Sequence, residues 1–231
     1  MTKFAMQHPN LQLGVVVSNP FEENTLVARL PNQTECLIVD PGFEPRKVLE
    51  CLAAHDLQPA AILNTHGHSD HIAGNGAMKS RWPNCPLIIG RDEAEKLTDP
   101  QLNLSAGYGV ALKSPEADIL VGDEDTICYA GLELNVLKTP GHSSGHVVFV
   151  WKAEPPFVVF GGDVLFAGGI GRTDFYDGNF SDLEASIHNK LFTLPDDTIV
   201  LPGHGSATTI GREKQTNPFV GIPAGYRPNG G

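Results

Sequence analysis

The chain has 231 residues, of which 41% are hydrophobic and 19% charged, and its net charge at pH 7 is −11. This length and composition are typical of a folded globular protein with a sizeable core, and they exclude a disordered chain. The negative charge disfavours non-specific nucleic-acid binding, which needs lysine and arginine against phosphates, and so argues against RNA-cutting enzymes.

Short apolar runs predict a series of strands interrupted by helices. The predicted strands, in chain order, are residues 11–18, 25–30, 36–39, 60–64, 86–90, 126–129, 132–138, 147–152, 157–160 and 198–201. The predicted helices are residues 45–55, 72–81, 92–97, 181–192 and 208–216. Pro45 suits a first helical turn, and Ser181 to Glu184 has the pattern of a capping box. Two strand-rich halves, each flanked by helices, predict a single domain over residues 1–231.

Residues 98–118 show no clear periodicity and are predicted to form a long loop. A loop of this length inside a compact domain is usually functional, often as a lid or a binding loop.

The cysteines and the apolar stretches indicate the compartment. Cys36, Cys51, Cys85 and Cys128 form no Cys-x-x-Cys pair and lie in or near apolar stretches, which favours reduced core cysteines. The N-terminus lacks the apolar core of a signal peptide, and the most apolar long stretch, residues 157–171, is too short to span a membrane. We therefore expect a cytoplasmic protein with no membrane partner.

The most informative stretch is Thr65–His71, where three histidines and an aspartate follow a predicted strand. Neutral imidazole and carboxylate groups suit zinc, iron and manganese. Four donors so close in sequence can rarely all reach one tetrahedral ion, so two adjacent metal ions are predicted. The alternative is a polar surface loop that is merely rich in histidine.

Three later segments repeat one form, in which an apolar strand ends, a glycine allows a sharp turn and a metal-type ligand follows. The three segments end in Gly141-His142, Gly162-Asp163 and Gly203-His204. If these strands lie side by side, their ends converge on one edge of the fold.

Together with Thr65–His71, these segments closely resemble the motifs of the metallo-β-lactamase superfamily, in order and over nearly the whole chain. The resemblance implies an α+β fold, namely an αβ/βα sandwich of two mixed sheets flanked by helices, with the site at its edge. It also implies two divalent metal ions, zinc first, with iron or manganese as alternatives. Carried over by position, the ligands are His66, His68 and His142 for one metal, Asp70, His71 and His204 for the second, and Asp163 as the bridge.

The expected chemistry follows from the two ions. Metals about 3.5 to 4 Å apart can share a water and lower its pKa towards neutrality, which yields a hydroxide that attacks a carbonyl carbon. A metal also stabilises the developing oxyanion. We expect Asp70 to be chiefly a ligand and, as a catalytic group, also to accept or relay a proton.

Within the superfamily the chain is most similar to the short glyoxalase II-like, or hydroxyacylglutathione hydrolase-like, branch. The likeness lies in Phe21–Thr25, Asp163–Phe166, Gly169–Asp174 and Asn217–Phe219. It implies that the substrate is a small-molecule thioester, and more specifically a glutathione conjugate such as S-lactoylglutathione. Thioesters suit the site because thiolate is a good leaving group.

Two features depart from typical glyoxalase II enzymes. Those enzymes have lysine where this chain has Arg172, and aromatic residues at the positions of Thr173 and Asp174. Arg172 and Asp174 are candidate substrate-binding residues, since the guanidinium either pairs with a substrate carboxylate or forms a structural salt bridge with Asp174. Typical enzymes also add a C-terminal helical domain, which the residues after His204 are too few to supply.

Other functions remain open at this point. Gly171–Phe175 resembles persulfide dioxygenases, which use one iron and oxygen and retain similar ligand positions. A polyketide-pathway thioester hydrolase and a non-catalytic metal-binding protein are further alternatives. A true β-lactamase is disfavoured by the absence of an export signal.

The remaining histidines and one aspartate have less specific predictions. His146 is predicted to pack at the start of the next strand, with a position beside the metal ligands as the alternative. Asp40 either hydrogen-bonds the metal loops or is a plain turn residue. His8, His55 and His188 have no matching partners and are predicted to be surface or helix residues.

Overall fold

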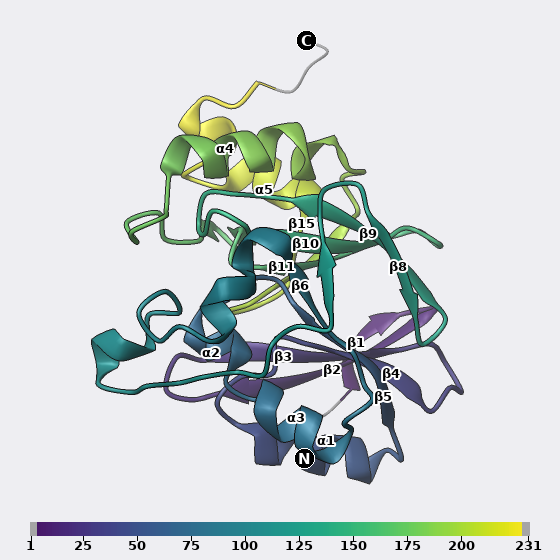
Figure 1. The fold of residues 1–231 in the computed structure, drawn as a ribbon. Coiled ribbons are helices and arrows are strands. Elements are labelled where there is room, and N and C mark those ends of the chain that lie inside the picture. Colours follow the sequence, from purple (N-terminus) through teal and green to yellow (C-terminus); the bar gives the residue numbers. More distant parts are fainter. Residues whose placement is uncertain (1–3, 228–231) are drawn as a thin grey trace.

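Two mixed β-sheets pack face to face in the computed structural model, which describes residues 4–227 (Figure 1). The first sheet contains, in spatial order, β1 (Phe4–His8), β2 (Leu11–Ser18), β3 (Glu23–Arg29), β4 (Glu35–Val39), β5 (Gln58–Asn64), β6 (Leu87–Gly90) and β7 (Ile119–Val121). Strands β1 to β4 run antiparallel, whereas β4 to β7 are parallel. Since β4 and β5 are parallel neighbours, the residues that follow them meet at one sheet edge.

The second sheet contains, in spatial order, β15 (Thr208–Thr209), β14 (Ile199–Pro202), β11 (Val158–Gly162), β10 (Val147–Trp151), β9 (Leu132–Lys138) and β8 (Thr126–Tyr129). Its β11 and β14 are parallel, and the other neighbours are antiparallel. A separate hairpin joins β12 (Leu165–Phe166) to β13 (Gly169–Ile170).

Helices cover the outer face of each sheet. The α-helices are α1 (Pro45–Ala54), α2 (Ser69–Ile72), α3 (Asn75–Arg81), α4 (Phe180–Asn189) and α5 (Ile210–Thr216). The 3₁₀ helices are η1 (Arg91–Leu97), η2 (Ser105–Tyr108), η3 (Leu191–Thr193) and η4 (Ile222–Ala224). Figure 1 shows α1 and α3 against the first sheet at the bottom of the view and α4 and α5 over the second sheet at the top.

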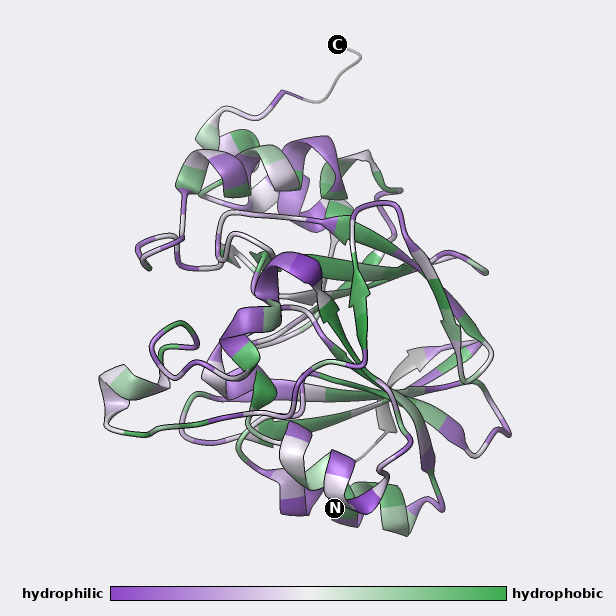
Figure 2. Ribbon diagram, in the orientation of Figure 1, coloured by the Kyte–Doolittle hydropathy of each residue, from purple (hydrophilic) through white to green (hydrophobic). Residues whose placement is uncertain are grey.

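Three apolar layers hold this arrangement together. The central layer lies between the sheets and includes Leu37 and Leu63 from the first and Phe149 and Phe160 from the second. A second layer lies under α1, and a third joins the second sheet to α4, where Leu183 is fully buried. Because both faces of the central strands are covered, those strands read as continuous apolar runs, which appear green in Figure 2.

The predicted αβ/βα sandwich of two mixed sheets flanked by helices is confirmed, but some local predictions are wrong. The helix predicted at residues 72–81 is two helices, α2 and α3, because the chain turns at Gly74, whose N–H donates to Pro41 O at 2.7 Å. A Cβ on Gly74 would lie 2.8 Å from the same oxygen, so this approach of two backbone segments requires glycine.

The capping box predicted at Ser181 is also wrong. Helix α4 begins one residue earlier, and the side chain of Asn179 caps it by accepting from Asp182 N at 3.1 Å. The helix ends at Asn189 and is followed by η3, while the helix predicted from Thr208 starts with the short strand β15.

The cysteine prediction holds for three of the four residues. Cys36, Cys51 and Cys85 are free and buried, whereas Cys128 is free but exposed. Burial raises the pKa of Cys36 to about 12, which keeps that thiol protonated and unreactive.

None of the helices within residues 4–227 combines the length and the apolar character that a bilayer crossing requires. The cytoplasmic location and the single domain over residues 1–231 stay predictions.

Candidate metal centre

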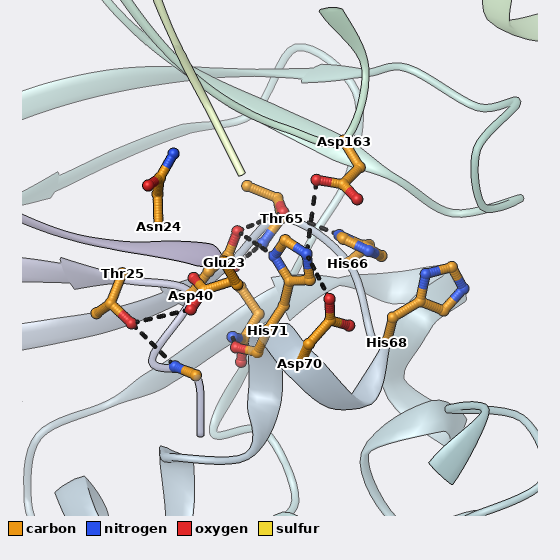
Figure 3. Close-up of polar contacts among 12 residues, drawn as sticks. Glu23, Asn24, Thr25, Asp40, Thr65, His66, His68, Asp70, His71 and Asp163 are labelled. Atoms are coloured by element: carbon orange, nitrogen blue, oxygen red, sulfur yellow. Dashed lines mark hydrogen bonds and ion pairs between the residues drawn. The ribbon is translucent and has the colours of Figure 1, made fainter. Parts of the chain in front are cut away.

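Four loops that follow strands converge at one edge of the sandwich, as the sequence predicts. Thr65–His71 follows β5, and Figure 3 shows its polar side chains gathered beneath Asp163. The other loops follow β9, β11 and β14 and supply His142, Asp163 and His204. The first sheet therefore provides one part of the cluster, and the second sheet provides the other.

The expected ligand atoms form two groups of three, and a further group joins Asp40 to His66 and His71, one member of each. One nitrogen from each of His66, His68 and His142 lies within 4.8 Å of the others, and His68 Nδ1 is 3.0 Å from His142 Nε2. We call these residues the first triad. One ligand atom from each member of a second triad meets the same limit, and that triad consists of Asp70, His71 and His204.

Asp163 lies between the two triads. Its Oδ2 is 3.6 Å from His142 Nε2 in the first triad and 3.4 Å from His204 Nε2 in the second. Its Oδ1 is 3.5 Å from His71 Nε2, an approach drawn in Figure 3. One carboxylate thus faces ligand atoms of both groups.

Unpartnered buried atoms show that these residues fit metal ions. His66 Nε2, His71 Nε2 and Asp163 Oδ1 are buried without a hydrogen-bond partner. Burying such atoms unpaired costs free energy, and proteins rarely tolerate it without a compensating interaction. Imidazole and carboxylate donors are those that zinc, iron and manganese prefer, so divalent ions would satisfy these atoms.

The electrostatics of the first triad and of Asp163 favour metal binding, whereas in the second triad Asp163 and Asp70 raise the pKa of His71 and His204 above the ordinary value against the effect of burial. Burial, reinforced by neighbouring cationic groups, lowers the pKa of His66 and His68 well below the ordinary value, so both imidazoles are neutral. Burial by itself would raise the pKa of Asp163, but His71 and His204 lower it well below its usual range. Neutral imidazole and ionised carboxylate are the protonation states that bind metal.

Asp40 anchors the second triad from behind. Its Oδ1 accepts from Thr65 N at 2.8 Å, and its Oδ2 accepts from Thr65 Oγ1 at 2.7 Å and lies 3.1 Å from His71 Nδ1 (Figure 3). Both oxygens are therefore engaged, and the contact leaves His71 Nε2 directed at Asp70 and Asp163. Of the two alternatives for Asp40, hydrogen bonding to the metal loops is confirmed.

Asn24 and Phe21 hold the loop of His204. The Asn24 side chain donates to Pro202 O at 3.1 Å and to Gly205 O at 2.8 Å, and Asn24 N donates to Gly203 O at 2.7 Å. His204 Nδ1 bonds to Phe21 O at 3.0 Å. The sequence singled out Phe21–Thr25 only through its family likeness. Hydrogen bonds that span 178 positions leave no local sequence pattern.

His146 lies beside the ligands, immediately before β10. The ring is fully buried and stacks on His66 with 4.9 Å between centroids. Its Nδ1 is 3.1 Å from Thr139 Oγ1, and its Nε2 accepts from Asp163 N at 3.2 Å. Both ring nitrogens are engaged, so His146 supports the cluster without belonging to either triad.

The other histidines lie away from the cluster. His8 is buried rather than at the surface, since its Nε2 bonds to Pro156 O at 2.9 Å and its ring meets Trp151 edge-on. His188 lies in α4 as predicted and bonds to Val220 O at 2.8 Å, and His55 follows α1.

A cavity of about 230 Å³ opens beside the triads. Apart from ligand residues, its walls are mainly apolar and aromatic, formed by Phe21, Leu104, Tyr108, Phe166, Ile170 and Phe175. A small, mostly apolar cavity with polar groups gathered at one end is the usual form of a small-molecule site.

Arg172 lies at this cavity and is paired with Asp174. Two guanidinium nitrogens donate to the two carboxylate oxygens, each at 2.8 Å, and the side chains are 64% and 66% exposed. The Arg172 guanidinium also lies 4.6 Å from the centre of the Phe175 ring. The salt bridge predicted as one alternative is thus present, in an exposed setting where such a pair adds little stability.

The loop of residues 98–118 forms another part of the cavity wall. Figure 1 shows it as a teal segment that projects from one side of the molecule. Its Leu104 and Tyr108 line the cavity, and Asn103 O accepts from Ser69 N at 2.9 Å. The loop is therefore fastened to the segment of candidate ligands, and its role as a lid or binding loop stays a prediction.

Comparison with known proteins places this geometry in a family. The protein-family model described as "Metallo-beta-lactamase superfamily" matches residues 19–204. The probable metallo-hydrolase YqgX of Bacillus subtilis (strain 168) is 40% identical over 83% of this chain and 90% of its own length. The hydroxyacylglutathione hydrolase GloC of Haemophilus influenzae is 34% identical over 91% of this chain and 98% of its own length.

Solved structures are similar over most of their length. The BLEG-1 B3 metallo-beta-lactamase has a TM-score of 0.86 and 37% identity, covering 90% of this chain and 99% of its own. The di-iron-bound form of TTHA1623 has a TM-score of 0.77 and 33% identity over 89% and 98%, and ETHE1 from Myxococcus xanthus has 0.75 and 29% over 93% and 85%. The chain belongs to the metallo-β-lactamase superfamily.

Proposed function

We propose that this chain is a metal-dependent thioester hydrolase that acts on hydroxyacylglutathione-type substrates. The observation that carries the proposal is the pair of His/Asp triads, linked by Asp163 and open to a cavity of about 230 Å³. The similarity of this chain to the hydroxyacylglutathione hydrolase GloC, over nearly the full length of both, supports the choice of substrate class.

In this proposal each triad would hold one divalent ion, zinc first, and Asp163, which faces ligand atoms of both triads, would serve as a ligand common to the two. Iron and manganese accept the same donors, and the similar structure of TTHA1623 was solved in a di-iron-bound form. When bound, two ions would supply Lewis-acid activation of a water molecule and of a carbonyl oxygen.

Asp70 is the residue of this chain placed to move a proton. Its carboxylate lines the cavity, and Oδ2 lies 3.4 Å from His204 Nε2 and 3.7 Å from His71 Nε2. Neighbouring His71 and His204 hold its pKa below the ordinary value against the effect of burial, so the carboxylate is ionised and can accept a proton from an attacking water. A thiolate leaving group needs little help from an acid.

Arg172 is the residue proposed to bind a carboxylate of the glutathione part of the substrate. It is the one arginine or lysine among the described residues that line the cavity, and its exposed pair with Asp174 is open to exchange. A substrate carboxylate can replace Asp174 at the same two guanidinium nitrogens, because both partners offer the same bidentate geometry.

A mononuclear-iron persulfide dioxygenase is the second candidate. It is favoured by the resemblance at Gly171–Phe175 and by the position of Phe175, whose ring centre lies 5.0 Å from that of His68 and 5.5 Å from that of His142. An aromatic ring against the first triad would shield an ion bound there from water.

The test combines metal analysis with three assays on the purified protein. We expect about two metal ions per chain and hydrolysis of S-lactoylglutathione. About one iron per chain, no thioester turnover and oxygen uptake with glutathione persulfide would select the second candidate. Turnover of a β-lactam without thioester turnover would reject both.

A further inference from the structure

A buried ion pair lies directly behind the first triad. Glu93 and Lys96 belong to η1, their side chains are 0% and 4% exposed, and Lys96 Nζ is 3.0 Å from Glu93 Oε2. Removing two charges from water is costly, and a buried pair often contributes no more stability than apolar residues of the same size. The contacts of this pair therefore point to a role other than stability.

Glu93 joins the two loops that carry the first triad. Its Oε2 accepts from Gly67 N at 2.8 Å, and Gly67 stands between His66 and His68. Its Oε1 accepts from Gly145 N at 2.8 Å and from the hydroxyl of Ser143, the residue after His142. One carboxylate thus spans the first-sheet and second-sheet contributions to the same group of ligands.

Lys96 extends the link to a third loop. Its Nζ donates to Ser143 Oγ and, at 2.7 Å, to Asp177 Oδ2, which also accepts from Ser144 N at 3.1 Å. The chain leading to Asp177 includes Arg172, whose carbonyl bonds to His142 Nδ1 at 2.8 Å. The pair therefore contacts Ser143, next to His142, and Asp177, in the segment whose Arg172 bonds to His142.

Close packing makes this connection rigid. A Cβ on Gly67 would lie 2.5 Å from Lys96 Cβ, and a Cβ on Gly145 would lie 2.9 Å from Glu93 Oε1. Only glycine permits these approaches, so both loops rest directly on the ion pair.

The second triad has supports besides this ion pair, one of which it shares with the first: Thr65 Oγ1, which donates to Asp40, also lies 3.1 Å from His66 Nδ1. Asp40 and Asn24 hold the residues around His71 and His204. Across residues 4–227, the side-chain hydrogen bonds of Glu93 and Lys96 go to each other, to the loops of His66, His68 and His142, and to Asp177.

We propose that Glu93 and Lys96 are positioning residues that set the metal affinity of the first triad without setting that of the second. They hold the loops of His68 and His142 at binding distance before an ion arrives, so less ordering is needed on binding. The inference rests on the two-metal centre of the proposed function. It adds that Glu93 and Lys96 position the ligands of only one of the two triads.

The test titrates chelator-treated protein with Zn²⁺ against a competing indicator. In Glu93→Gln we expect one of the two Zn²⁺ affinities to fall by about 10- to 100-fold while the other stays at the wild-type value. The control is Asp92→Asn, which alters an exposed ion pair with Lys138 at the neighbouring position and should leave both affinities unchanged.

Hydrogen exchange provides a readout that needs no metal. In the metal-free protein the amide of Gly67 or that of Gly145 should exchange faster in Glu93→Gln than in wild type, because they bond to different carboxylate oxygens and glutamine replaces one of the two with a donor. If Glu93→Gln does not fold, Ser143→Ala removes one link and keeps the ion pair, and it should give the same selective but smaller loss of affinity.

Equal loss at both sites, or unchanged affinities, would overturn the inference. Unchanged exchange at Gly67 and Gly145 would do the same. These outcomes are separate from the proposed function, which fails if wild-type protein with two ions bound does not hydrolyse thioesters.

Discussion

At the scale of single residues, Asp40 shows how much of the metal centre lies outside the ligands. Replacing Asp40 by asparagine keeps the shape but exchanges one acceptor oxygen for a donor, which then faces either Thr65 or the Nδ1 of His71. We expect Asp40→Asn to weaken Zn²⁺ binding at the second triad by about 10- to 100-fold. Competitive titration measures this, with the exposed Glu50→Gln on α1 as control. Equal binding in both variants would contradict the role of Asp40.

The ligands themselves give a stronger prediction. Asp163 faces both triads and His68 belongs to the first, so Asp163→Ala and His68→Ala should lose metal and activity together. Elemental analysis and a thioester assay measure the two losses, and circular dichroism shows whether the fold persists. A variant that kept both its metal and its activity would show that the assignment is wrong.

At the scale of elements, the 98–118 loop contributes a wall of the cavity rather than a reacting group. Tyr108 is 59% exposed and meets Phe21 edge-on with 5.3 Å between ring centres. We expect Tyr108→Ala to raise KM several-fold and to leave kcat nearly unchanged, because the lost contact is with the bound substrate. Steady-state kinetics on the thioester measure both. Val110→Ala, at an exposed residue of the same loop, is the control, and an equal effect there would contradict the prediction.

The N-terminal cap of helix α4 can be tested by mutation. Asn179 caps it through its side chain, and Asn179 N also donates to Gly141 O at 2.7 Å, next to His142. Asn179→Ala should therefore cost about 1 kcal/mol of stability and lower Tm by about 2–4 °C. Ser181→Ala should leave Tm close to the wild-type value. Thermal unfolding separates the two, and a larger loss at Ser181 would reverse the assignment of the cap.

The elements also show which features a sequence can reveal. The clustering of the candidate ligands was predictable because each lies in a segment that follows an apolar strand and a local motif marks it, as in Gly203-His204. Glu93 was not, because its partners Gly67 and Gly145 lie 26 and 52 positions away and no local pattern connects them. The break between α2 and α3 escaped prediction for the same reason, since it depends on a contact between Gly74 and Pro41.

At the scale of the whole molecule, metal ions would join the two sheets. The second triad takes Asp70 and His71 from the loop after β5 of the first sheet and His204 from the loop after β14 of the second. A ligand that binds only the folded state, at a free concentration 1,000 times its Kd, adds about 4 kcal/mol to the free energy of unfolding.

Metal removal should accordingly destabilise the protein. For a chain of this size, that loss corresponds to a decrease in Tm of about 8–16 °C on treatment with a chelator, and added Zn²⁺ should restore the original value. Scanning calorimetry measures the change. An unchanged Tm after complete metal removal, verified by elemental analysis, would contradict the role of the ions as a link between the sheets.

The ligand order along the chain has a consequence for biosynthesis. Thr65–His71 leaves the ribosome first, followed by His142 and then by His204, and the hydrogen bond from Asn24 to Pro202 closes across 178 positions. A nascent chain that stops before His142 therefore holds no complete triad, and one that stops before His204 lacks a ligand of the second. In the proposed two-metal centre, tight capture of both ions would therefore wait until His204 has left the ribosome, by which point every strand up to β14 has been synthesised.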